Sequence, residues 1–209
     1  MGPAVRFRDV HKRFGAVVAN HGISFDIAAG SIHGIVGENG AGKSTLMSIL
    51  YGFYRADGGQ IEVDGLPLEL RHSEDAIAAG IGMVHQHFML VDTFTVLENV
   101  VLGAERGALL KHSLEHATGV LRTLADDYQL RVPLDVRCGE LSVGAQQRVE
   151  ILKALYRGAR ILILDEPTGV LTPQEADQLF RVLRTLAGQG VTIVLITHKL
   201  REILAVTDV

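Results

Sequence analysis

The nine residues GENGAGKST at positions 37–45 decide the fold of this 209-residue chain. They fit the pattern G-x-x-x-x-G-K-[ST], whose fixed positions are here Gly37, Gly42, Lys43 and Ser44. The run SIHGIV at Ser31–Val36 predicts a buried strand before the loop, and KSTLMSILY at Lys43–Tyr51 predicts a helix after it. Strand, glycine loop and helix in this order make up a P-loop.

A loop of this composition can surround a phosphate group. Its glycines let backbone N–H groups point inward, and the helix that follows adds the positive end of its dipole. We therefore predict an ATP site formed by Gly37, Glu38, Asn39, Gly40, Ala41, Gly42, Lys43, Ser44 and Thr45. Lys43 should reach the β- and γ-phosphates, Ser44 should ligate Mg²⁺, and Thr45 should contact the α-phosphate. The alternative, a plain glycine-rich turn, does not account for the flanking strand and helix.

A second motif is ILILDEP at Ile161–Pro167, where an apolar strand ends in two adjacent carboxylates. Asp165 would hold Mg²⁺, and Glu166 would polarise the water that attacks the γ-phosphate. An Asp-Glu pair at a strand end can also be only a solvated turn. Because open parallel sheets bind ligands at the carboxyl ends of their strands, the P-loop earlier in the chain favours the catalytic interpretation.

The remaining pattern predicts an α/β fold of the P-loop NTPase class, with a mostly parallel sheet and an N-terminal antiparallel β subdomain. Alternating β-formers between turn signals predict three antiparallel strands, at Ala4–Val10, Ile23–Ile27 and Gln60–Val63. Short apolar runs at Ile161–Leu164 and Val191–Ile196 are typical of central parallel strands. Between them, Thr172, Pro173 and Glu175 form a helix-start signature for a helix over Thr172–Leu186.

The middle of the chain is helical in pattern. Helical periodicity covers Leu114–Leu130 and Gln146–Tyr156, and no convincing strand is visible between Thr93 and Tyr156. We therefore expect a helical lobe at residues 88–156, inserted into a core made of residues 1–87 and 157–209.

The stretch LSVGAQQR at Leu141–Arg148 precedes a helix of this lobe and has two readings. Ser142 can be an ordinary N-cap followed by a glycine loop. The same geometry can also grip an anion through Ser142 and the backbone N–H of Gly144. Physical chemistry alone leaves both readings open.

Composition excludes several classes of protein. There are 20 Lys and Arg against 24 Asp and Glu, a net charge of −4, so the basic excess of a nucleic-acid-binding protein is absent. No apolar segment is long enough to span a bilayer. The single cysteine, Cys138, cannot form an internal disulfide, which fits a reducing cytosol. The apolar fraction of 47% fits either a partner that covers apolar surface or strands buried in a parallel sheet.

The P-loop, LSVGAQQR, ILILDEP and VTIVLITH occur in an order and at spacings that resemble the nucleotide-binding domain of ABC transporters. The resemblance covers practically the whole chain. It implies that two such domains pack head to tail and sandwich two ATP molecules. Ser142, Val143 and Gly144 would then complete the ATP site of the second domain.

The resemblance also implies roles for three further residues. Phe14 in KRFG would stack on adenine, although an ordinary core or surface aromatic is the alternative. Gln86 in MVHQHF would sense Mg²⁺ and the attacking water, and it leads into the lobe that faces the membrane partner. His198 would contact the γ-phosphate. His85 and His87 are expected to be surface or interface residues.

Three positions depart from the commonest pattern of this family. Val143 stands where glycine is usual, Ala145 where glutamine is usual, and Thr172 where aspartate is common. The absent aspartate implies a non-identical partner domain. The stretch from LSVGAQQR to ILILDEPT resembles the tandem-domain ATPases of bacterial sugar and nucleoside importers. We therefore expect membrane permease subunits as partners and a peripheral location on the cytoplasmic side of the inner membrane.

The chain ends at Val209, a few residues after His198, whereas the resembled family continues with more strands. We expect it to be part of the first domain of a tandem protein. Rival functions are a mechanical ABC ATPase that acts on DNA or the ribosome and a nucleotide-binding regulatory module with little turnover. A small-molecule kinase would have no use for LSVGAQQR or His198.

Overall fold

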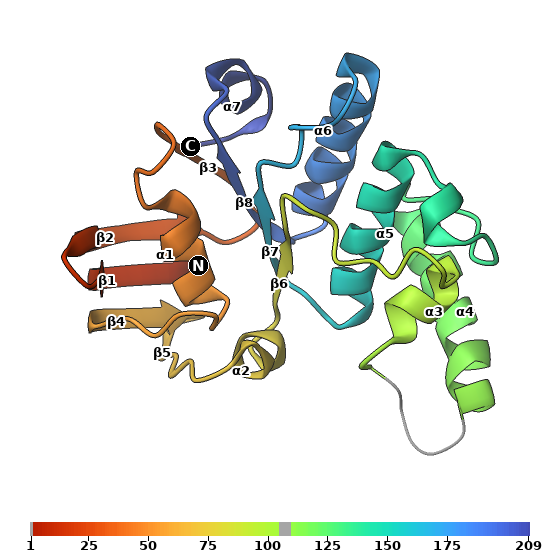
Figure 1. Cartoon of the computed structure of the whole chain (residues 1–209), viewed down its shortest axis with the longest axis horizontal. Coiled ribbons are helices and arrows are strands. Elements are labelled where there is room, and N and C mark those ends of the chain that lie inside the picture. The colour runs from red at the N-terminus through yellow and green to blue at the C-terminus, as the bar shows by residue number, and fades with distance from the viewer. Residues whose placement is uncertain (1, 105–109) are drawn as a thin grey trace.

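The strands of the computed structural model, which describes residues 2–104 and 110–209, form two four-stranded sheets (Figure 1). The strands are β1 (Pro3–Phe14), β2 (Val17–Ala28), β3 (Ile32–Val36), β4 (Gly58–Val63), β5 (Leu66–Pro67), β6 (Ile81–Val84), β7 (Ile161–Asp165) and β8 (Thr192–Thr197). The α-helices are α1 (Lys43–Leu50), α2 (Ser73–Ala78), α3 (Val96–Val101), α4 (Leu110–Asp127), α5 (Val143–Tyr156), α6 (Pro173–Gly188) and α7 (Leu200–Val206). One 3₁₀ turn, η1, spans Cys138–Glu140.

The parallel sheet has the strand order β3-β8-β7-β6, and all of its pairings are parallel. Its central strands are buried on both faces. On β7, Ile161 and Ile163 belong to one hydrophobic core, while Leu162 and Leu164 belong to the other. This two-sided burial explains why the strand is an unbroken apolar run up to Asp165.

The antiparallel sheet has the order β2-β1-β4-β5 and forms the N-terminal side of the molecule (Figure 1). Helix α1 lies between the two sheets. Its Met47 and Leu50 share a core with Phe7 of the antiparallel sheet and Ile163 of the parallel sheet. The helix that follows the P-loop is therefore held from both sides, and its N-terminus is fixed beside the parallel sheet.

Helices α3, α4 and α5 lie together on the side away from the antiparallel sheet (Figure 1). Val100 of α3, Leu121 of α4 and Val149 of α5 pack into the same core as Leu164 of β7. Within the described part of this region, the only strand-like pairing is one isolated bridge between Thr95 and Arg137. None of the helices in residues 2–104 and 110–209 has both the length and the hydrophobicity needed to cross a bilayer.

The predicted α/β class is confirmed, and most of the predicted elements are present with altered ends. The β1–β2 hairpin is longer than Ala4–Val10 and Ile23–Ile27. Helix α4 ends at Asp127 rather than Leu130, because Gln129 adopts a left-handed backbone conformation with φ of 57°. The pattern did not predict β5, β6, α2, α3 or α7. Strand β6 is only four residues long, IGMV, and contains glycine and methionine instead of a β-branched run.

Two predicted helix caps are confirmed. At the start of α6, the Thr172 hydroxyl accepts a hydrogen bond from the Glu175 N–H at 3.3 Å, and Glu175 Oε2 accepts from the Thr172 N–H at 3.0 Å. Pro173 occupies the first helical turn. At the start of α5, the Ser142 hydroxyl accepts from the Ala145 N–H at 3.3 Å. These caps fix where the loops beside the parallel sheet enter their helices.

Candidate functional site

One cavity, called the nucleotide-site cavity below after the predicted role of its residues, brings together predicted site residues from five separate parts of the chain. Its lining includes Phe14, residues 39–45 of the P-loop, Gln86, Glu166 and His198. The P-loop follows β3, Gln86 follows β6, Glu166 follows β7 and His198 follows β8. In a parallel sheet the carboxyl ends of all strands meet at one edge, which is where ligands bind in open α/β folds.

The P-loop has the geometry of an anion site. Gly42 is the N-cap of α1, and no side chain caps the helix there. The first N–H groups of α1 are therefore directed at the loop with no side-chain acceptor, next to the positive end of the helix dipole. Gly42 has φ of 82°, and a Cβ at this position would overlap the carbonyl oxygen of Ala19. Only glycine fits there without a shift of the backbone.

Lys43 spans this loop. Its Nζ donates hydrogen bonds to the carbonyl oxygens of Gly37 at 2.7 Å and of Glu38 at 2.8 Å. Gly37 and Glu38 do not line the cavity with the rest of the loop, but these bonds connect them to it. The ammonium group is thus held at the loop, where it can balance the charge of phosphate oxygens.

Ser44 and Asp165 meet across a sequence separation of 121 residues. The Ser44 hydroxyl donates to Asp165 Oδ1 at 3.1 Å. Burial raises the pKa of Asp165, and the hydrogen bond from Ser44 opposes that rise. A hydroxyl and a carboxylate beside a phosphate site are the oxygen ligands that Mg²⁺ prefers, so this pair fits the predicted metal. No cluster of three or more His, Cys, Asp or Glu suited to a metal occurs among the described residues. The third predicted ligand, Gln86, lines the cavity together with Ser44, whereas Asp165 is not among the lining residues and reaches the cavity through its bond to Ser44.

Glu166 and His198 form a hydrogen-bonded pair. Glu166 Oε1 lies 2.8 Å from His198 Nδ1 and accepts from the His198 backbone N–H at 3.1 Å. An ionised carboxylate can only accept, so Nδ1 carries a proton in this contact. The Glu166 side chain is 13% exposed and its φ is 49°, an unusual value for a residue other than glycine. The pair is positioned for proton transfer to or from a water molecule in the cavity.

Phe14 lies at the end of β1 and is 43% exposed, so it is not a core aromatic. Its ring meets Tyr54 edge to face, with centroids 5.1 Å apart, and Lys12 Nζ lies 5.3 Å from the ring centroid. These contacts orient the ring while leaving part of it open at the cavity. Stacking of adenine on Phe14 stays a prediction.

Ser142 and Gly144 do not line this cavity; they lie at the N-terminus of α5. Ser142 is a cap, as one reading of LSVGAQQR predicted. The Gly144 N–H donates to the carboxylate of Glu175, a residue of the same chain, at 3.3 Å, and binding of a phosphate at this N–H stays a prediction. A Cβ on Gly144 would lie 2.8 Å from Glu175 Oε1, so glycine leaves the room that this carboxylate occupies.

Sequence reasoning missed four residues of the nucleotide-site region. Val17, Val18 and Ala19 of β2 line the cavity, and Asn20 is buried beneath the P-loop. Asn20 Nδ2 donates to the Gly42 carbonyl oxygen at 3.2 Å. Nothing in their residue types indicates this role. Only their position in the chain could have indicated it. They follow Phe14 closely, so a strand that begins just after Phe14 begins beside the cavity.

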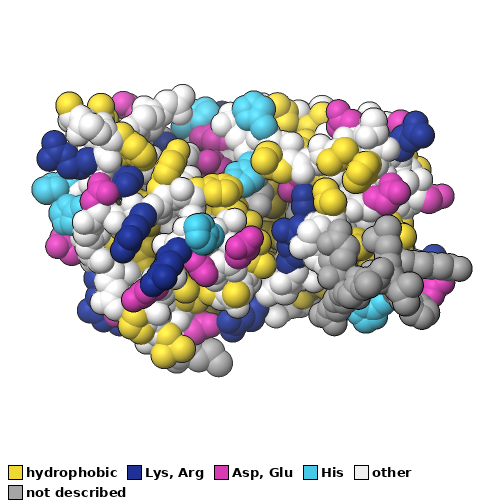
Figure 2. Space-filling view, turned by 60° about the horizontal axis from the view of Figure 1, so that its bottom comes forward, with side chains coloured by type: hydrophobic (Ala, Val, Ile, Leu, Met, Phe, Trp, Pro, Cys, Tyr) yellow, Lys and Arg dark blue, Asp and Glu magenta, His cyan; other side chains and the backbone are white. Residues whose placement is uncertain are grey.

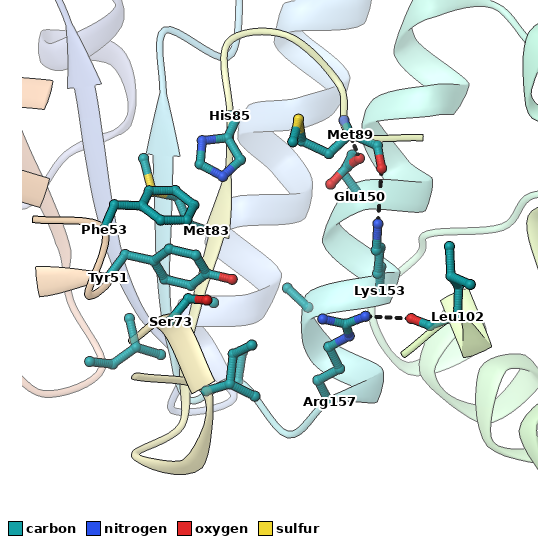
Figure 3. A pocket seen from close by; sticks show the side chains of 15 residues that line it. Tyr51, Phe53, Ser73, Met83, His85, Met89, Leu102, Glu150, Lys153 and Arg157 are labelled. Carbon is teal, nitrogen blue, oxygen red and sulfur yellow. Dashed lines mark hydrogen bonds between the residues drawn. The ribbon is translucent and has the colours of Figure 1, made fainter. Parts of the chain in front are cut away.

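A second cavity, called the groove below, lies between the parallel sheet and α5 (Figure 3). Tyr51, Phe53 and His85 line one side, and the ring of His85 stacks on Phe53 with centroids 5.5 Å apart. Met89 bridges to α5, because its N–H donates to Glu150 Oε1 at 2.8 Å and its carbonyl oxygen accepts from Lys153 Nζ at 3.0 Å.

His85 and Gln86 are consecutive, yet His85 lines the groove and Gln86 lines the nucleotide-site cavity. The short segment after β6 therefore separates the two cavities. The face in Figure 2 carries Lys and Arg interspersed with Asp, Glu and hydrophobic side chains. This mixture differs from the single-sign patch of a nucleic-acid-binding face.

A family model described as ABC transporter matches residues 20–169. The chain belongs to the ABC transporter family. This ABC domain is 48% identical to the glucose import ATP-binding protein TsgD13 of Haloferax volcanii, over 99% of the chain and 42% of that protein. It is 50% identical to the nucleoside import ATP-binding protein NupA of Lactococcus lactis, over 98% of the chain and 40% of that protein. The chain thus spans about two fifths of the length of these relatives.

Solved structures place the ABC domain in the same fold. The ADP conformation of MJ1267, an ATP-binding cassette of an ABC transporter, superposes with a TM-score of 0.86 at 27% identity, covering 100% of this chain and 86% of that one. The dimeric structure of MJ0796, a bacterial ABC transporter cassette, gives a TM-score of 0.77 at 27% identity, covering 95% of this chain and 89% of that one. The chain is therefore an ABC transporter ATP-binding domain, homologous to sugar and nucleoside import ATP-binding proteins.

Proposed function

We propose that this ABC domain binds ATP with Mg²⁺, hydrolyses it, and so drives a membrane permease that imports sugars or nucleosides. The observation that carries the proposal is the single cavity shared by the P-loop, Gln86, Glu166 and His198. Those side chains come from four strand ends, and they are the types that phosphoryl transfer to water requires.

The chemistry assigns each residue a task. The N–H groups at the start of α1 and the Lys43 ammonium bind phosphate oxygens, while Phe14 binds the adenine ring. Ser44, Asp165 and Gln86 would hold Mg²⁺, which neutralises charge that develops on the phosphate oxygens. Glu166 orients and polarises the attacking water, and His198 holds the Glu166 carboxylate while facing the γ-phosphate.

The site requires a second domain. Ser142 and Gly144 lie outside the cavity, so they would complete the ATP site of a partner domain. The dimeric form of the MJ0796 cassette supports such pairing. Thr172 stands in place of the common aspartate, which supports a partner domain that is not identical to this one. The relatives are more than twice as long as the chain, so both domains would fit within one polypeptide.

The membrane partner would bind at the groove. Residues 88–156 would form the inserted helical lobe, and the groove lies where that lobe meets the core beside His85. A permease segment that moved Met89 would also move Gln86, three residues away, and so signal to the nucleotide. The names of TsgD13 and NupA, a glucose and a nucleoside import ATP-binding protein, support sugars or nucleosides as cargo. A domain that hydrolyses ATP for import would lie peripherally on the cytoplasmic side of the inner membrane, where ATP is available.

Two substitutions in the full-length protein test the proposal. Lys43→Ala should abolish ATP binding, whereas Glu166→Gln should retain binding but slow hydrolysis by about 10²-fold or more. Gln189→Ala is the matched control, since Gln189 Nε2 also donates to a backbone carbonyl, that of Asp127 at 3.1 Å, but lies outside the nucleotide-site cavity and the groove. Binding is measured by calorimetry and hydrolysis by phosphate release. Parent-like hydrolysis by Glu166→Gln would disprove the assignment of the base.

A further inference from the structure

A partly buried polar cluster, close in the chain to the Glu166–His198 pair, has no role in the function proposed above. It consists of Thr168, Thr197, Lys199 and Glu202, called the Glu202 cluster below. The Thr168 hydroxyl donates to Glu202 Oε1 at 2.5 Å, and the Thr197 hydroxyl donates to Glu202 Oε2 at 3.2 Å. Thr168 is 3% exposed and Thr197 is fully buried, so these bonds are shielded from solvent.

The two threonines flank the two residues of the pair. Thr168 lies two positions after Glu166, and Thr197 directly precedes His198. One carboxylate, projecting from the first turn of α7, thus binds the loop after β7 to the end of β8, where the loop that carries His198 begins. The distance between Glu166 and His198 depends on how these two loops are spaced.

Lys199 closes the Glu202 cluster. Its Nζ lies 3.2 Å from Glu202 Oε1 and donates to the Thr168 carbonyl oxygen at 3.3 Å. The Lys199 backbone N–H donates to the Thr197 hydroxyl at 3.0 Å. The Glu202 carboxylate therefore has a counterion and two hydroxyl donors, and loss of the carboxylate would leave buried groups without partners.

Glu166 needs such support because of its backbone. A φ of 49° is a left-handed conformation that a residue with a long side chain adopts only when its surroundings hold it there. Bonds outside the Glu202 cluster also hold this turn. The Glu166 N–H donates to the Ile196 carbonyl oxygen at 2.9 Å, the Glu166 carbonyl oxygen accepts from the Gly169 N–H at 3.1 Å, and Gln147 Nε2 donates to the Pro167 carbonyl oxygen at 2.8 Å.

A simple helix cap does not explain Glu202. A residue that caps a helix accepts from the first N–H groups of that helix. Both Glu202 oxygens instead accept from hydroxyls of other elements, and the N-cap of α7, Lys199, makes no side-chain capping bond. The hydroxyl contacts of Glu202 therefore join the loop after β7 to the end of β8 and do not cap α7.

We infer that Glu202 is a positioning residue for hydrolysis, which sets the spacing of Glu166 and His198 without touching the nucleotide. The inference rests on the proposed function, since it assumes that the pair acts on ATP. Glu202 does not line the nucleotide-site cavity, so its loss should lower kcat and leave the KM for ATP unchanged.

The first test is steady-state ATP hydrolysis by the full-length protein. Glu202→Gln keeps the shape but loses the charge and one acceptor, and Thr168→Val removes the hydroxyl. Each should lower kcat by about tenfold or more with KM unchanged, since hydrogen bonds to charged groups are among the strong ones. Thr168→Ser, which keeps the hydroxyl, should restore most of the rate.

Asp208→Asn is the matched control. Asp208 is another carboxylate that joins distant elements, accepting from the Ile32 N–H at 2.8 Å and from Arg184 at 2.7 Å. It touches neither loop of the pair. Asp208→Asn should therefore reduce stability like Glu202→Gln but leave kcat at the parent value.

The second readout needs no turnover. NMR of the ¹⁵N-labelled chain reports whether the Nδ1 atom of His198 is hydrogen-bonded. We expect this hydrogen bond in the parent and in Asp208→Asn. We expect it to be absent in Glu202→Gln and Thr168→Val. If Glu202→Gln and Thr168→Val match Asp208→Asn in kcat and in this spectrum, Glu202 has only a structural role and the inference is wrong. A parent that binds no ATP, or a Glu166→Gln variant that hydrolyses it normally, would instead refute the proposed function.

Discussion

The carboxylate of Glu175 accepts a hydrogen bond from the backbone N–H of Gly144, with Oε1 at 3.3 Å. Its other oxygen accepts from the N–H and the hydroxyl of Thr172, at 3.0 and 2.9 Å. One side chain thus joins the start of α5 to the start of α6. If a γ-phosphate from a partner domain binds Gly144, it must first displace this carboxylate, because both are anions that need the same N–H.

Replacing Glu175 by alanine should therefore open the Gly144 N–H to phosphate. The measurement is a titration of the ¹⁵N-labelled chain with inorganic phosphate, in which NMR follows the Gly144 amide signal. In Glu175→Ala this signal should saturate at a phosphate concentration at least about tenfold lower than in the parent, because the Glu175 carboxylate no longer competes through its charge-assisted hydrogen bond. The amides of the P-loop report phosphate binding there in the same spectra.

Glu98 provides the control for this experiment. It forms the same capping box with Thr95, in which Thr95 N–H donates to Glu98 Oε2 at 2.8 Å, but Glu98 belongs to α3 and does not contact Gly144. Glu98→Ala should weaken a helix cap and leave the Gly144 response as in the parent. If the Gly144 amide signal responded to phosphate equally in the parent and in Glu175→Ala, Glu175 would not compete with phosphate for this N–H. This holds whether the shared response is strong or absent.

Gly42→Ala should destroy the nucleotide site. The added Cβ would overlap the Ala19 carbonyl oxygen, and the φ of 82° strains any residue with a side chain, so the backbone beneath the P-loop must move. We expect a loss of about 1–3 kcal/mol in the free energy of unfolding together with loss of ATP binding. Calorimetry and urea denaturation measure the two effects.

Gly158→Ala is the control for Gly42→Ala, because it introduces the strain of a positive φ without any overlap of the added Cβ with other atoms. Gly158 has φ of 84° and open space around its Cβ position, far along the chain from the P-loop. It should show part of the stability loss and bind ATP normally. If both variants bound ATP equally well, close packing of the P-loop on β2 would not be needed for the site.

Local patterns were sufficient where neighbouring residues alone determine the structure. The apolar run before Asp165 predicted β7, because burial on both faces of a parallel sheet demands it. Thr172, Pro173 and Glu175 predicted the start of α6 through contacts that span three residues. The glycines and Lys43 predicted the P-loop for the same reason.

Contacts between distant residues could not be predicted in this way. Glu175 meets Gly144 across 31 positions, and Glu202 meets Thr168 across 34. In each case the residue type is ordinary for a helix start, and only the packing of α6 and α7 against the loops gives it a second role. The cavity-lining part of β2 was missed likewise, because the pairing of β1 with β2 brings it beside the P-loop.

Phe14→Ala should weaken ATP binding by about 5- to 100-fold, because stacking of an aromatic side chain on a base contributes about 1–3 kcal/mol. Phe14→Trp should retain most of the affinity, since the indole also offers a flat face. The control is Phe53→Ala, which removes a similarly exposed aromatic from the groove and not from the nucleotide-site cavity. Equal affinities for Phe14→Ala and Phe53→Ala would exclude the stacking role.

The capping carboxylates should make the fold sensitive to acid. Hydrogen bonds from the Thr95 N–H and hydroxyl lower the pKa of Glu98. Because the pKa is lower in the folded than in the unfolded chain, the stabilisation is complete above the unfolded value and disappears as pH falls through the folded value. The stability that Glu98→Gln costs should therefore be largest at pH 7 and should shrink as pH falls below the unfolded pKa, as measured by urea denaturation.

Glu150 should respond to pH in the opposite direction. Burial raises the pKa of Glu150, although the Met89 N–H and the nearby Lys153 oppose that rise. A carboxyl whose pKa is raised in the folded chain destabilises the fold as pH rises from the unfolded pKa to the folded pKa. In this range the unfolded chain has already released the proton, while the folded chain still binds it.

Glu150→Gln keeps an acceptor for Met89 but removes this titration. The stability of Glu150→Gln relative to the parent should therefore increase between pH 4 and pH 7, while that of Glu98→Gln decreases. Parallel pH profiles for the two variants would show that Glu150 is stabilised as a carboxylate and not as a neutral acid.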